Sequence, residues 1–311
     1  MPAVSLKNIS KTYSDGKVKA VNNVSFEVGH GEMFGLIGPD GAGKTSIFRI
    51  LTTLLLPDKG QATVGGLDVI KDYRVIRNKV GYMPGKFSLY QDLTVAENLT
   101  FFAAIFKTTI EENYDLIKDI YEQIKPFSNR PAGKLSGGMK QKLALCCALI
   151  HKPEVLFLDE PTTGVDVVSR KEFWEMLKRL KEQRISILVS TPYMDEASLC
   201  DRIALIQNGN IMSVDSPQNI IDSFPTQLFA IKSKDIYRLL KDFRLDPAVE
   251  SCYAFGEHLH LTLKDDHDGN KTLERMAAHY QAEDFKSQLI TPVIEDSFIR
   301  LMQQNEKAGV N

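Results

Sequence analysis

The stretch GPDGAGKT at residues 38–45 is the feature that most constrains how this chain can fold. An apolar run, Met33–Ile37, precedes it and predicts a strand, and a helix is expected over residues 44–55. Three glycines allow the backbone to curl, so that successive N–H groups point inward toward an anion. The N-terminus of the following helix adds its positive end at the same point. The pattern G-x-x-x-x-G-K-[ST] therefore predicts a strand, a phosphate-binding loop and a helix in succession.

The side chains of this loop suit a nucleoside triphosphate bound together with a magnesium ion. Lys44 is expected to neutralise the β- and γ-phosphates, and Thr45 to supply its hydroxyl to Mg²⁺. The residues assigned to ATP binding here are Gly38, Pro39, Asp40, Gly41, Ala42, Gly43, Lys44, Thr45 and Ser46. A glycine turn with a chance lysine is the alternative, but the flanking strand and helix are the context that the motif requires.

A second apolar strand, VLFLDEP at residues 155–161, ends in two carboxylates. Asp159, at the tip of the strand, can hold Mg²⁺, usually through a water molecule. Glu160 can orient or deprotonate the water molecule that attacks the terminal phosphate. Such a pair is a common strand ending when it occurs alone. Together with the phosphate loop it predicts a nucleotide-hydrolysing site.

A third motif, LSGGMKQ at residues 135–141, predicts the start of a helix. Ser136 is a good N-cap residue, and Gly137 and Gly138 leave the backbone open at the helix N-terminus. An open helix N-terminus favours an anion. The chain thus carries a second candidate anion site, although the phosphate loop already provides a site for the phosphates of one nucleotide.

The order of strands and helices indicates an α/β fold with a helical insertion. The insertion covers about residues 94–150 and opens with the capping box T-x-x-E, formed by Thr94 and Glu97. We expect a first domain over residues 1–215. A small α+β domain over residues 216–303 has the order β-α-β-β-α-β, which suggests a ferredoxin-like unit. Residues 304–311 are expected to form a disordered tail.

The composition is that of a globular protein, with 43% hydrophobic residues, 25% charged residues and a net charge of −2. This balance gives no argument for nucleic-acid binding, so no nucleic-acid partner is expected. No run of 18 apolar residues predicts a membrane span, and the first residues lack the apolar stretch of a signal peptide. The four cysteines lack C-x-x-C spacing and are expected to be reduced and buried in a cytoplasmic protein.

The three motifs and the sequence TTGVD after LDEP resemble the nucleotide-binding domains of ABC transporters, over about residues 4–215. This resemblance implies a P-loop NTPase cassette with an antiparallel β subdomain. It implies that Tyr13 stacks on adenine and that Asp166 lies in a loop that crosses a dimer interface. It also explains the second anion site, because Ser136, Gly137 and Gly138 would contact the γ-phosphate bound by a second cassette, in a homodimer or heterodimer arranged head to tail.

The motif order, the stretch GYMPGKFSLYQDLTVAENL and the small C-terminal unit look most like ATP-binding subunits of bacterial ABC-2-type exporters of drugs and lipids. The resemblance implies a transmembrane permease of the ABC-2 type as partner. It places the chain in the cytoplasm, peripheral on the inner face of the cell membrane. The helical region near residues 84–106 would then be where the permease docks.

Three residues depart from the family pattern. Asp40 stands where the family has asparagine, and Gly85 stands where it has a glutamine that contacts Mg²⁺ and the attacking water. Gln91 is the only nearby glutamine, and it would need a loop rearrangement to replace it. Pro192 occupies the position of the switch histidine, which holds the γ-phosphate and the water in line. With Thr191 as N-cap, Pro192 falls at N1 of a predicted helix, the position that best accepts proline.

The departures leave two interpretations of function open. In the first, the chain is a transport-coupled ATPase with Glu160 as the catalytic base. In the second, it is a degenerate cassette that binds ATP, hydrolyses it slowly and pairs with a competent cassette. Losing two positioning groups would lower the rate on the order of 10²–10⁴-fold, while ATP binding would survive. A soluble ABC protein of translation or DNA repair fits less well, because such proteins usually carry two cassettes or long coiled-coil insertions.

His258 and His260 lie two residues apart on a predicted strand and therefore on one of its faces. Metal binding is one interpretation of this spacing. We favour a solvated strand face opposite the leucines that alternate with the histidines.

Overall fold

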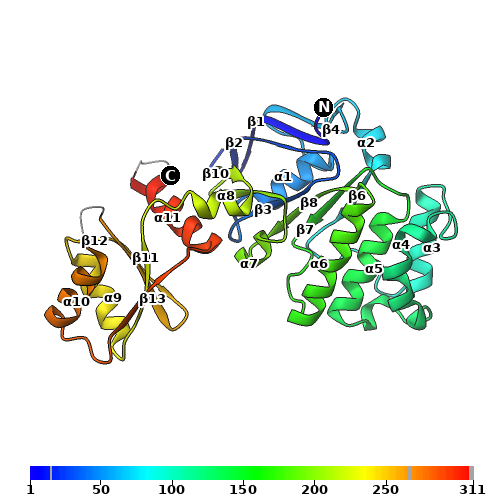
Figure 1. Cartoon of the computed structure of the whole chain (residues 1–311). Helices are drawn as coiled ribbons and strands as arrows, with labels where there is room; N and C mark the ends of the chain where they lie inside the picture. The colour runs from blue at the N-terminus through cyan, green and yellow to red at the C-terminus, as the bar shows by residue number, and fades with distance from the viewer. Residues whose placement is uncertain (15, 265–267, 308–311) are drawn as a thin grey trace. The chain divides into compact units, whose positions relative to one another are not determined.

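The computed structural model describes residues 1–14, 16–264 and 268–307, and the chain divides into two compact units (Figure 1). The first unit covers Met1–Pro217, and the second begins at Gln218. This division lies two residues beyond the boundary expected after residue 215. Each unit has a separate hydrophobic core. Within the described part of the chain, no helix has both the length and the apolar character needed to cross a membrane.

Two sheets form the frame of the first unit. Its strands are β1 (Val4–Tyr13), β2 (Val18–Val28), β3 (Met33–Ile37), β4 (Lys59–Val64), β5 (Leu67–Asp68), β6 (Val80–Met83), β7 (Val155–Asp159), β8 (Ser186–Thr191), β9 (Arg202–Gln207) and β10 (Asn210–Asp215). The antiparallel sheet has the order β2-β1-β4-β5. The larger sheet has the order β10-β9-β3-β8-β7-β6 and is parallel except at β10. The carboxyl ends of β3, β7 and β8 therefore lie at one edge, where parallel α/β sheets bind ligands.

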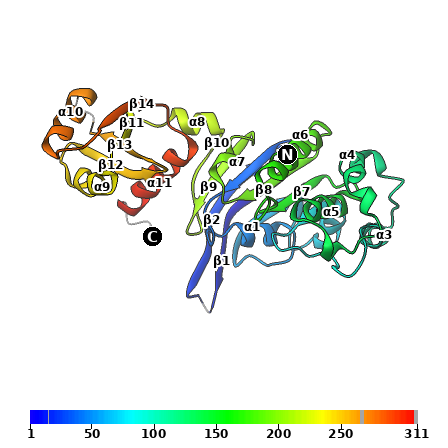
Figure 2. The same cartoon turned by 90° about the horizontal axis from the view of Figure 1, so that it is seen from below.

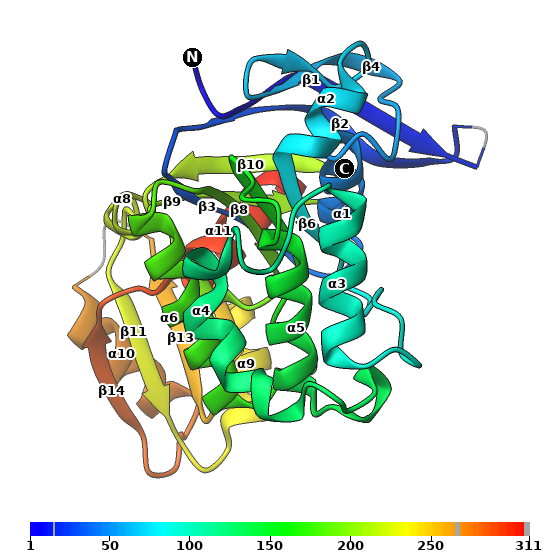
Figure 3. The same ribbon diagram turned by 90° about the vertical axis from the view of Figure 1, so that its right-hand side faces the viewer.

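The helices of the first unit connect these strands. They are α1 (Lys44–Leu51), α2 (Tyr73–Lys79), α3 (Val95–Ile105), α4 (Tyr114–Ile124), α5 (Gly137–Leu149), α6 (Val167–Glu182) and α7 (Met194–Ala197). Helices α3 to α6 lie side by side (Figures 1 and 3). The predicted capping box opens α3, since Thr94 and Glu97 satisfy each other's backbone N–H groups. Helix α1 is shorter than predicted because Thr53 adopts a left-handed backbone, with φ of +63°.

The core of the first unit joins both sheets to α1. Phe26 and Phe34 stack with ring centroids 5.2 Å apart, and Phe48 of α1 meets Phe157 of β7 edge to face at 6.1 Å. Burial of each such side chain contributes about 1.5–3 kcal/mol to folding. Figure 2 shows α1 beside the strands of the larger sheet. This packing fixes the loop between β3 and α1 against the carboxyl end of the sheet.

The second unit confirms the predicted order β-α-β-β-α-β. Its elements are β11 (Leu228–Lys232), α9 (Ile236–Leu245), β12 (Val249–Phe255), β13 (His258–Leu263), α10 (Gly269–His279), β14 (Lys286–Ile290) and α11 (Ile294–Lys307), and α8 (Pro217–Asp222) begins at the boundary between the units. The sheet is antiparallel with the order β12-β13-β11-β14. Residues 304–307, expected in a tail, continue α11. Residues 308–311 lie outside the described residues.

The interpretation of His260 as part of a solvated strand face is wrong. His260 is buried, and its Nδ1 lies 2.6 Å from the Asp296 carboxylate of α11. Tyr253 donates its hydroxyl to the same carboxylate at 2.8 Å. Helices α9 and α10 cover the leucine face of β13. Asp296 of α11 contacts the opposite face at His260, which the alternation of the sequence alone leaves open. No group of three or more His, Cys, Asp or Glu that could hold a metal occurs among the described residues.

Candidate active site

The loop of residues 38–43 runs from the end of β3 to the start of α1, as the motif predicts. Gly38 has no room for a side chain, because an added Cβ would lie 2.1 Å from the carbonyl oxygen of Ile206. Gly43 has a φ of +105°, and a Cβ there would lie 2.1 Å from the carbonyl oxygen of Ala20. Both positions therefore require glycine for the backbone to curl over the end of the sheet.

Lys44 is buried at the centre of this loop, with only 3% of its surface exposed. Its Nζ donates to the carbonyl oxygens of Gly38 at 2.8 Å and Pro39 at 3.0 Å. It also pairs with Oε1 of Glu160 at 3.0 Å. The ammonium group therefore holds the loop in place and links it to the acidic end of β7. A buried ammonium group beside open backbone N–H groups favours phosphate oxygens.

The two acidic residues at the end of β7 are held by Ser190 of β8. The Ser190 hydroxyl donates to Oδ1 of Asp159 at 2.7 Å, and the backbone N–H of Glu160 donates to the same hydroxyl oxygen at 3.0 Å. Glu160 has a left-handed backbone, with φ of +52°, a strained conformation for a residue other than glycine. Burial raises the pKa of Tyr82 to about 12, and the Asp159 carboxylate adds to this rise. Sequence reasoning missed Ser190, which no motif marks.

Gly85 lies directly beside the acidic pair. A Cβ at this position would lie 3.0 Å from the carbonyl oxygen of Asp159 and 3.8 Å from Cβ of Glu160. A side chain here would therefore reach the site, but glycine offers none. Gln91 does not fill the gap, because its carbonyl accepts from the N–H of Gly133 at 2.8 Å and its side chain lies against that glycine.

Pro192 lies next to the phosphate loop. It follows Thr191, which pairs with Ile37 in the parallel register of β8 and β3. The N–H of Gly38 also donates to the carbonyl oxygen of Thr191 at 3.3 Å. A side chain with a hydrogen-bonding group at position 192 would thus adjoin the loop of residues 38–43, and proline has no such group.

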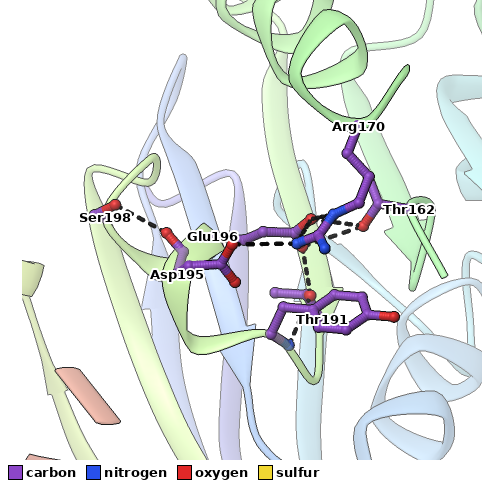
Figure 4. A network of polar contacts seen from close by, with 7 residues as sticks. Thr162, Arg170, Thr191, Asp195, Glu196 and Ser198 are labelled. Atoms are coloured by element: carbon purple, nitrogen blue, oxygen red, sulfur yellow. Dashed lines mark hydrogen bonds and ion pairs between the residues drawn. The ribbon is translucent and has the colours of Figure 1, made fainter. Parts of the chain in front are cut away.

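The prediction that Thr191 caps a helix with Pro192 at N1 is wrong. Thr191 ends β8, and α7 begins at Met194 with Tyr193 as its N-cap. The Thr191 hydroxyl does accept the N–H of Tyr193 at 3.1 Å, but Tyr193 has an extended backbone with φ of −87° and ψ of 116°. The hydroxyl donates its own proton to Glu196 of α7, so a carboxylate five residues later decides its role (Figure 4).

Tyr13 and Asp40 lie at the surface near the phosphate loop. The Tyr13 hydroxyl lies 3.2 Å from that of Ser46, which joins the end of β1 to α1. Tyr13 is 36% exposed, so part of its ring is open to a ligand. The Asp40 side chain is exposed. Its charge is therefore well solvated in the absence of phosphate, and solvation weakens its effect on the loop.

Ser136 and Asp166 lie on a second surface formed by the starts of α5 and α6. The Ser136 hydroxyl caps α5 by accepting the N–H of Met139 at 3.4 Å, as predicted. Asp166 caps α6 by accepting the N–H of Ser169 at 3.0 Å, which lowers the pKa of its carboxyl group. A Cβ on Gly138 would lie 2.7 Å from the Ser169 hydroxyl, so the two helix starts touch.

Two apolar side chains beside this surface are open to solvent. Val167 and Val168, in the first turn of α6, are 78% and 69% exposed. Apolar residues beside two helix N-termini fit a protein–protein contact better than a free surface. The two valines directly after Asp166 are a signal in the sequence that the prediction of an interface did not use.

A cavity of about 270 Å³ lies among the helical insertion, α1 and β6. Its lining comprises Thr52, Leu54, Arg77, Val80, Tyr82, Met83, Pro84, Ser88, Leu89, Phe102, Phe106, Ala144, Cys147, Ala148 and His151. His151 stacks on Phe106 with ring centroids 3.7 Å apart, and its Nε2 donates to the carbonyl oxygen of Val80 at 3.0 Å. Burial lowers the pKa of His151, and its Nδ1 has no hydrogen-bond partner within the described residues.

Comparison with known proteins agrees with this geometry. A family model described as "ABC transporter" matches residues 21–163. Over 311 residues the chain is 33% identical to the Nod factor export ATP-binding protein I of Rhizobium sp. (strain N33), with 96% of each protein covered. This chain belongs to the ABC transporter family. Its first unit is an ATP-binding cassette of this family.

Further relatives and a solved structure fit the same family. The cassette is 37% identical to the probable multidrug ABC transporter ATP-binding protein YbhF of Escherichia coli (strain K12). That match covers 96% of the cassette but 52% of YbhF, so the chain spans about half the length of this relative. The dimeric ATP-binding cassette MJ0796 bound to ADP and Pi has a TM-score of 0.62 and 27% identity, over 68% of this chain and 98% of that one.

Proposed function

We propose that this chain is the ATP-binding subunit of an ABC-type exporter, which binds and hydrolyses ATP at a head-to-tail dimer interface to drive a membrane permease. The convergence of the loop, Lys44 and Glu160 at the carboxyl end of β3 and β7 is the observation that carries this proposal. The names of the relatives, a multidrug transporter subunit and a Nod factor export protein, favour export. The transported substrate stays undefined.

ATP would bind with its phosphates in the loop of residues 38–46 and its adenine on Tyr13. The backbone N–H groups and the α1 N-terminus would hold the phosphate oxygens, while Lys44 exchanges part of its contact with Glu160 for the β- and γ-phosphates. Tyr13 offers a partly exposed aromatic face to the base. The hydrogen bond from Tyr13 to Ser46 would keep that ring near the loop.

Mg²⁺ fits the residues present, because Thr45 and Asp159 supply oxygen ligands of the kind this ion prefers. Thr45 lies in the first turn of α1, and Asp159 is a buried carboxylate with one side-chain donor, Ser190. The ion, when bound, supplies charge that neutralises the β- and γ-phosphates. Ser190 would keep the Asp159 carboxylate oriented toward it.

Glu160 would act as the general base, taking a proton from the water molecule that attacks the γ-phosphate. Ser190 holds the backbone of Glu160, so the side chain that carries the carboxylate begins from a fixed position. Gly85 and Pro192 adjoin the same space without a side chain that can hold that water. The catalytic water is therefore positioned by fewer groups than in a complete site of this family.

The second surface would complete the nucleotide site of another cassette. The α5 N-terminus at Ser136, Gly137 and Gly138 would contact the γ-phosphate bound by the partner, and Asp166 would lie across the interface. Contact between the α5 and α6 starts and the exposed Val167 and Val168 support this use. The partner is a second copy of this chain or a different cassette.

The cavity beside the helical insertion supports docking of an ABC-2-type transmembrane permease. Its lining is mainly apolar and includes Pro84, Leu89, Phe102 and Phe106 of residues 84–106. A short helix from a permease loop fits such a groove. In this arrangement the chain is cytoplasmic and peripheral on the inner face of the cell membrane.

Steady-state ATP hydrolysis by the purified chain, alone and with its permease, tests this proposal. We expect Mg²⁺-dependent turnover that Glu160→Gln removes without weakening ATP binding, because the variant loses the base but keeps the loop. Lys178→Ala is the control, since Lys178 pairs only at the surface, with Glu175. Turnover that survives Glu160→Gln would refute the assigned base.

A second function is favoured by Gly85 and Pro192 together. The chain would then bind ATP and close the dimer, but hydrolyse ATP slowly, and lend its own residues 136–138 to a competent partner cassette. ATP binding without turnover by the chain alone, followed by turnover after a different cassette is added, supports this alternative. Full turnover by the chain alone excludes it.

A further inference from the structure

A buried carboxylate outside the phosphate site connects three segments of the cassette. Glu196 of α7 is only 2% exposed. It accepts hydrogen bonds from the hydroxyls of Thr162, at 2.8 Å to Oε1, and Thr191. Arg170 of α6 donates to Oε1 through Nε at 3.0 Å, and its Nη2 also lies 3.0 Å from Oε1 (Figure 4). All of these contacts are long-range in sequence except that of Thr191.

Each of the three residues that donate to Glu196 belongs to a segment that also contributes to the proposed ATP site. Thr162 lies two residues after Glu160, in the loop that leaves β7. Thr191 ends β8 next to Ser190, which holds Glu160 and Asp159. The third donor, Arg170, lies one helical turn after Asp166 on α6. One carboxylate thus fixes the segment of the base relative to the Pro192 turn and the interface helix.

Arg170 also holds the turn at position 192 directly. Its guanidinium carbon lies 4.1 Å from the centroid of the Tyr193 ring, within the range of a cation–π contact. It reaches Asp195 with an ion pair of 3.3 Å. Tyr193 follows Pro192, so the guanidinium group holds the residue next to the turn.

Stability alone does not account for this arrangement. Desolvation of a buried ion pair costs about as much free energy as the pair returns, and apolar residues of similar volume often stabilise a fold more. A fixed geometry is the better explanation for a fully hydrogen-bonded buried carboxylate. Lys44 pairs with the Glu160 carboxylate and Ser190 holds its backbone, and this network fixes the segment that follows Glu160 through Thr162.

We propose that Arg170 and Glu196 are positioning residues, which hold Glu160 and the turn of residues 191–193 in register with the α6 start at the dimer interface. This inference rests on the proposed function, since it concerns the geometry of ATP hydrolysis. In this proposal neither Arg170 nor Glu196 contacts the nucleotide. They act through Thr162, Thr191 and Tyr193.

Single-turnover hydrolysis with the full-length chain in excess over ATP tests the proposal, with rates normalised to ADP-binding sites. Glu196→Gln is expected to lower the rate constant on the order of 10–100-fold, because a displacement of the catalytic base by about 1 Å has an effect of this size. The affinity for ADP should change less than about twofold. Arg170→Gln should match it. Arg170→Lys, which keeps the charge but loses the planar fork, should recover part of the rate.

Arg179→Gln is the matched control, because Arg179 lies on the same helix in an exposed ion pair with Asp119 at 3.2 Å. It should leave the rate unchanged. A merely structural role for Glu196 would lower the melting temperature while the rate per ADP-binding site stays constant, and that result would overturn the proposal. Equal rates for Arg170→Lys and Arg170→Gln would also contradict it.

Hydrogen exchange of the ADP-bound chain decides the question even without turnover. Glu196→Gln should speed exchange in both residues 160–166 and residues 191–197, because the carboxylate holds both segments. Faster exchange confined to α7 would overturn the positioning role. A wild-type chain that binds ADP but shows no hydrolysis would refute the proposed hydrolytic function instead, so the two failures are distinguishable.

Discussion

Replacing Gly85 with glutamine and Pro192 with histidine in one chain is expected to raise the rate of ATP hydrolysis on the order of 10²–10⁴-fold. Both positions adjoin the site: a Cβ at Gly85 would lie 3.8 Å from that of Glu160, and Pro192 follows the residue that contacts Gly38. The new side chains would supply hydrogen bonds to Mg²⁺, water and γ-phosphate that the present residues lack. Their effect should fall on kcat, because they act in the transition state.

The measurement is steady-state ATPase activity, with Gly85→Ala combined with Pro192→Ala as the matched control. That control removes the unusual residues without adding functional groups. A Cβ at position 85 meets the Asp159 carbonyl oxygen at 3.0 Å, so both double variants require the same small shift. Equal activity of the two double variants would show that the missing groups do not limit hydrolysis.

Removal of the Lys44 ammonium group should reduce ATP affinity on the order of 10²–10⁴-fold. Charge-assisted hydrogen bonds contribute about 1.5–3 kcal/mol each, and Lys44 is placed to give two to phosphate oxygens. Lys44→Met keeps an unbranched side chain that is one heavy atom shorter, and it removes the charge together with the N–H donors. Isothermal titration calorimetry with ATP measures the effect.

Lys44→Met also leaves Glu160 without its ion-pair partner, so its melting temperature must be recorded. The combination of Lys44→Met with Glu160→Gln removes both charges and isolates the loss of phosphate contact. Lys178→Ala serves as the surface control. ATP affinity within a factor of three of the wild type in Lys44→Met would contradict the assigned phosphate site.

The phosphate loop and both N-caps could be predicted from sequence because local geometry dictates them. Gly43 needs a left-handed backbone, and Ser136 and Thr94 cap the turns that immediately follow them. The second unit was also predictable, since its strands and helices alternate in a recognisable order. In each case, the information lies within a few residues.

The parts that could not be predicted depend on contacts between distant residues. Thr191 has the sequence features of a helix cap, yet its pairing with Ile37 of β3 makes it the end of a strand. His260 alternates with leucines as a solvated residue would, yet α11 covers it from 36 residues away. Ser190 and Arg170 belong to no motif, and only the sheet register and helix packing bring them to the site.

A structure of the Glu160→Gln chain with MgATP tests the central claim most directly, because this variant should bind ATP without consuming it. The account predicts two cassettes arranged head to tail. The γ-phosphate would lie between Lys44 of one cassette and Ser136 of the other, with Asp166 at the interface. ATP bound away from the loop of residues 38–46, or held by one cassette while residues 136–138 of every cassette face solvent, would contradict it.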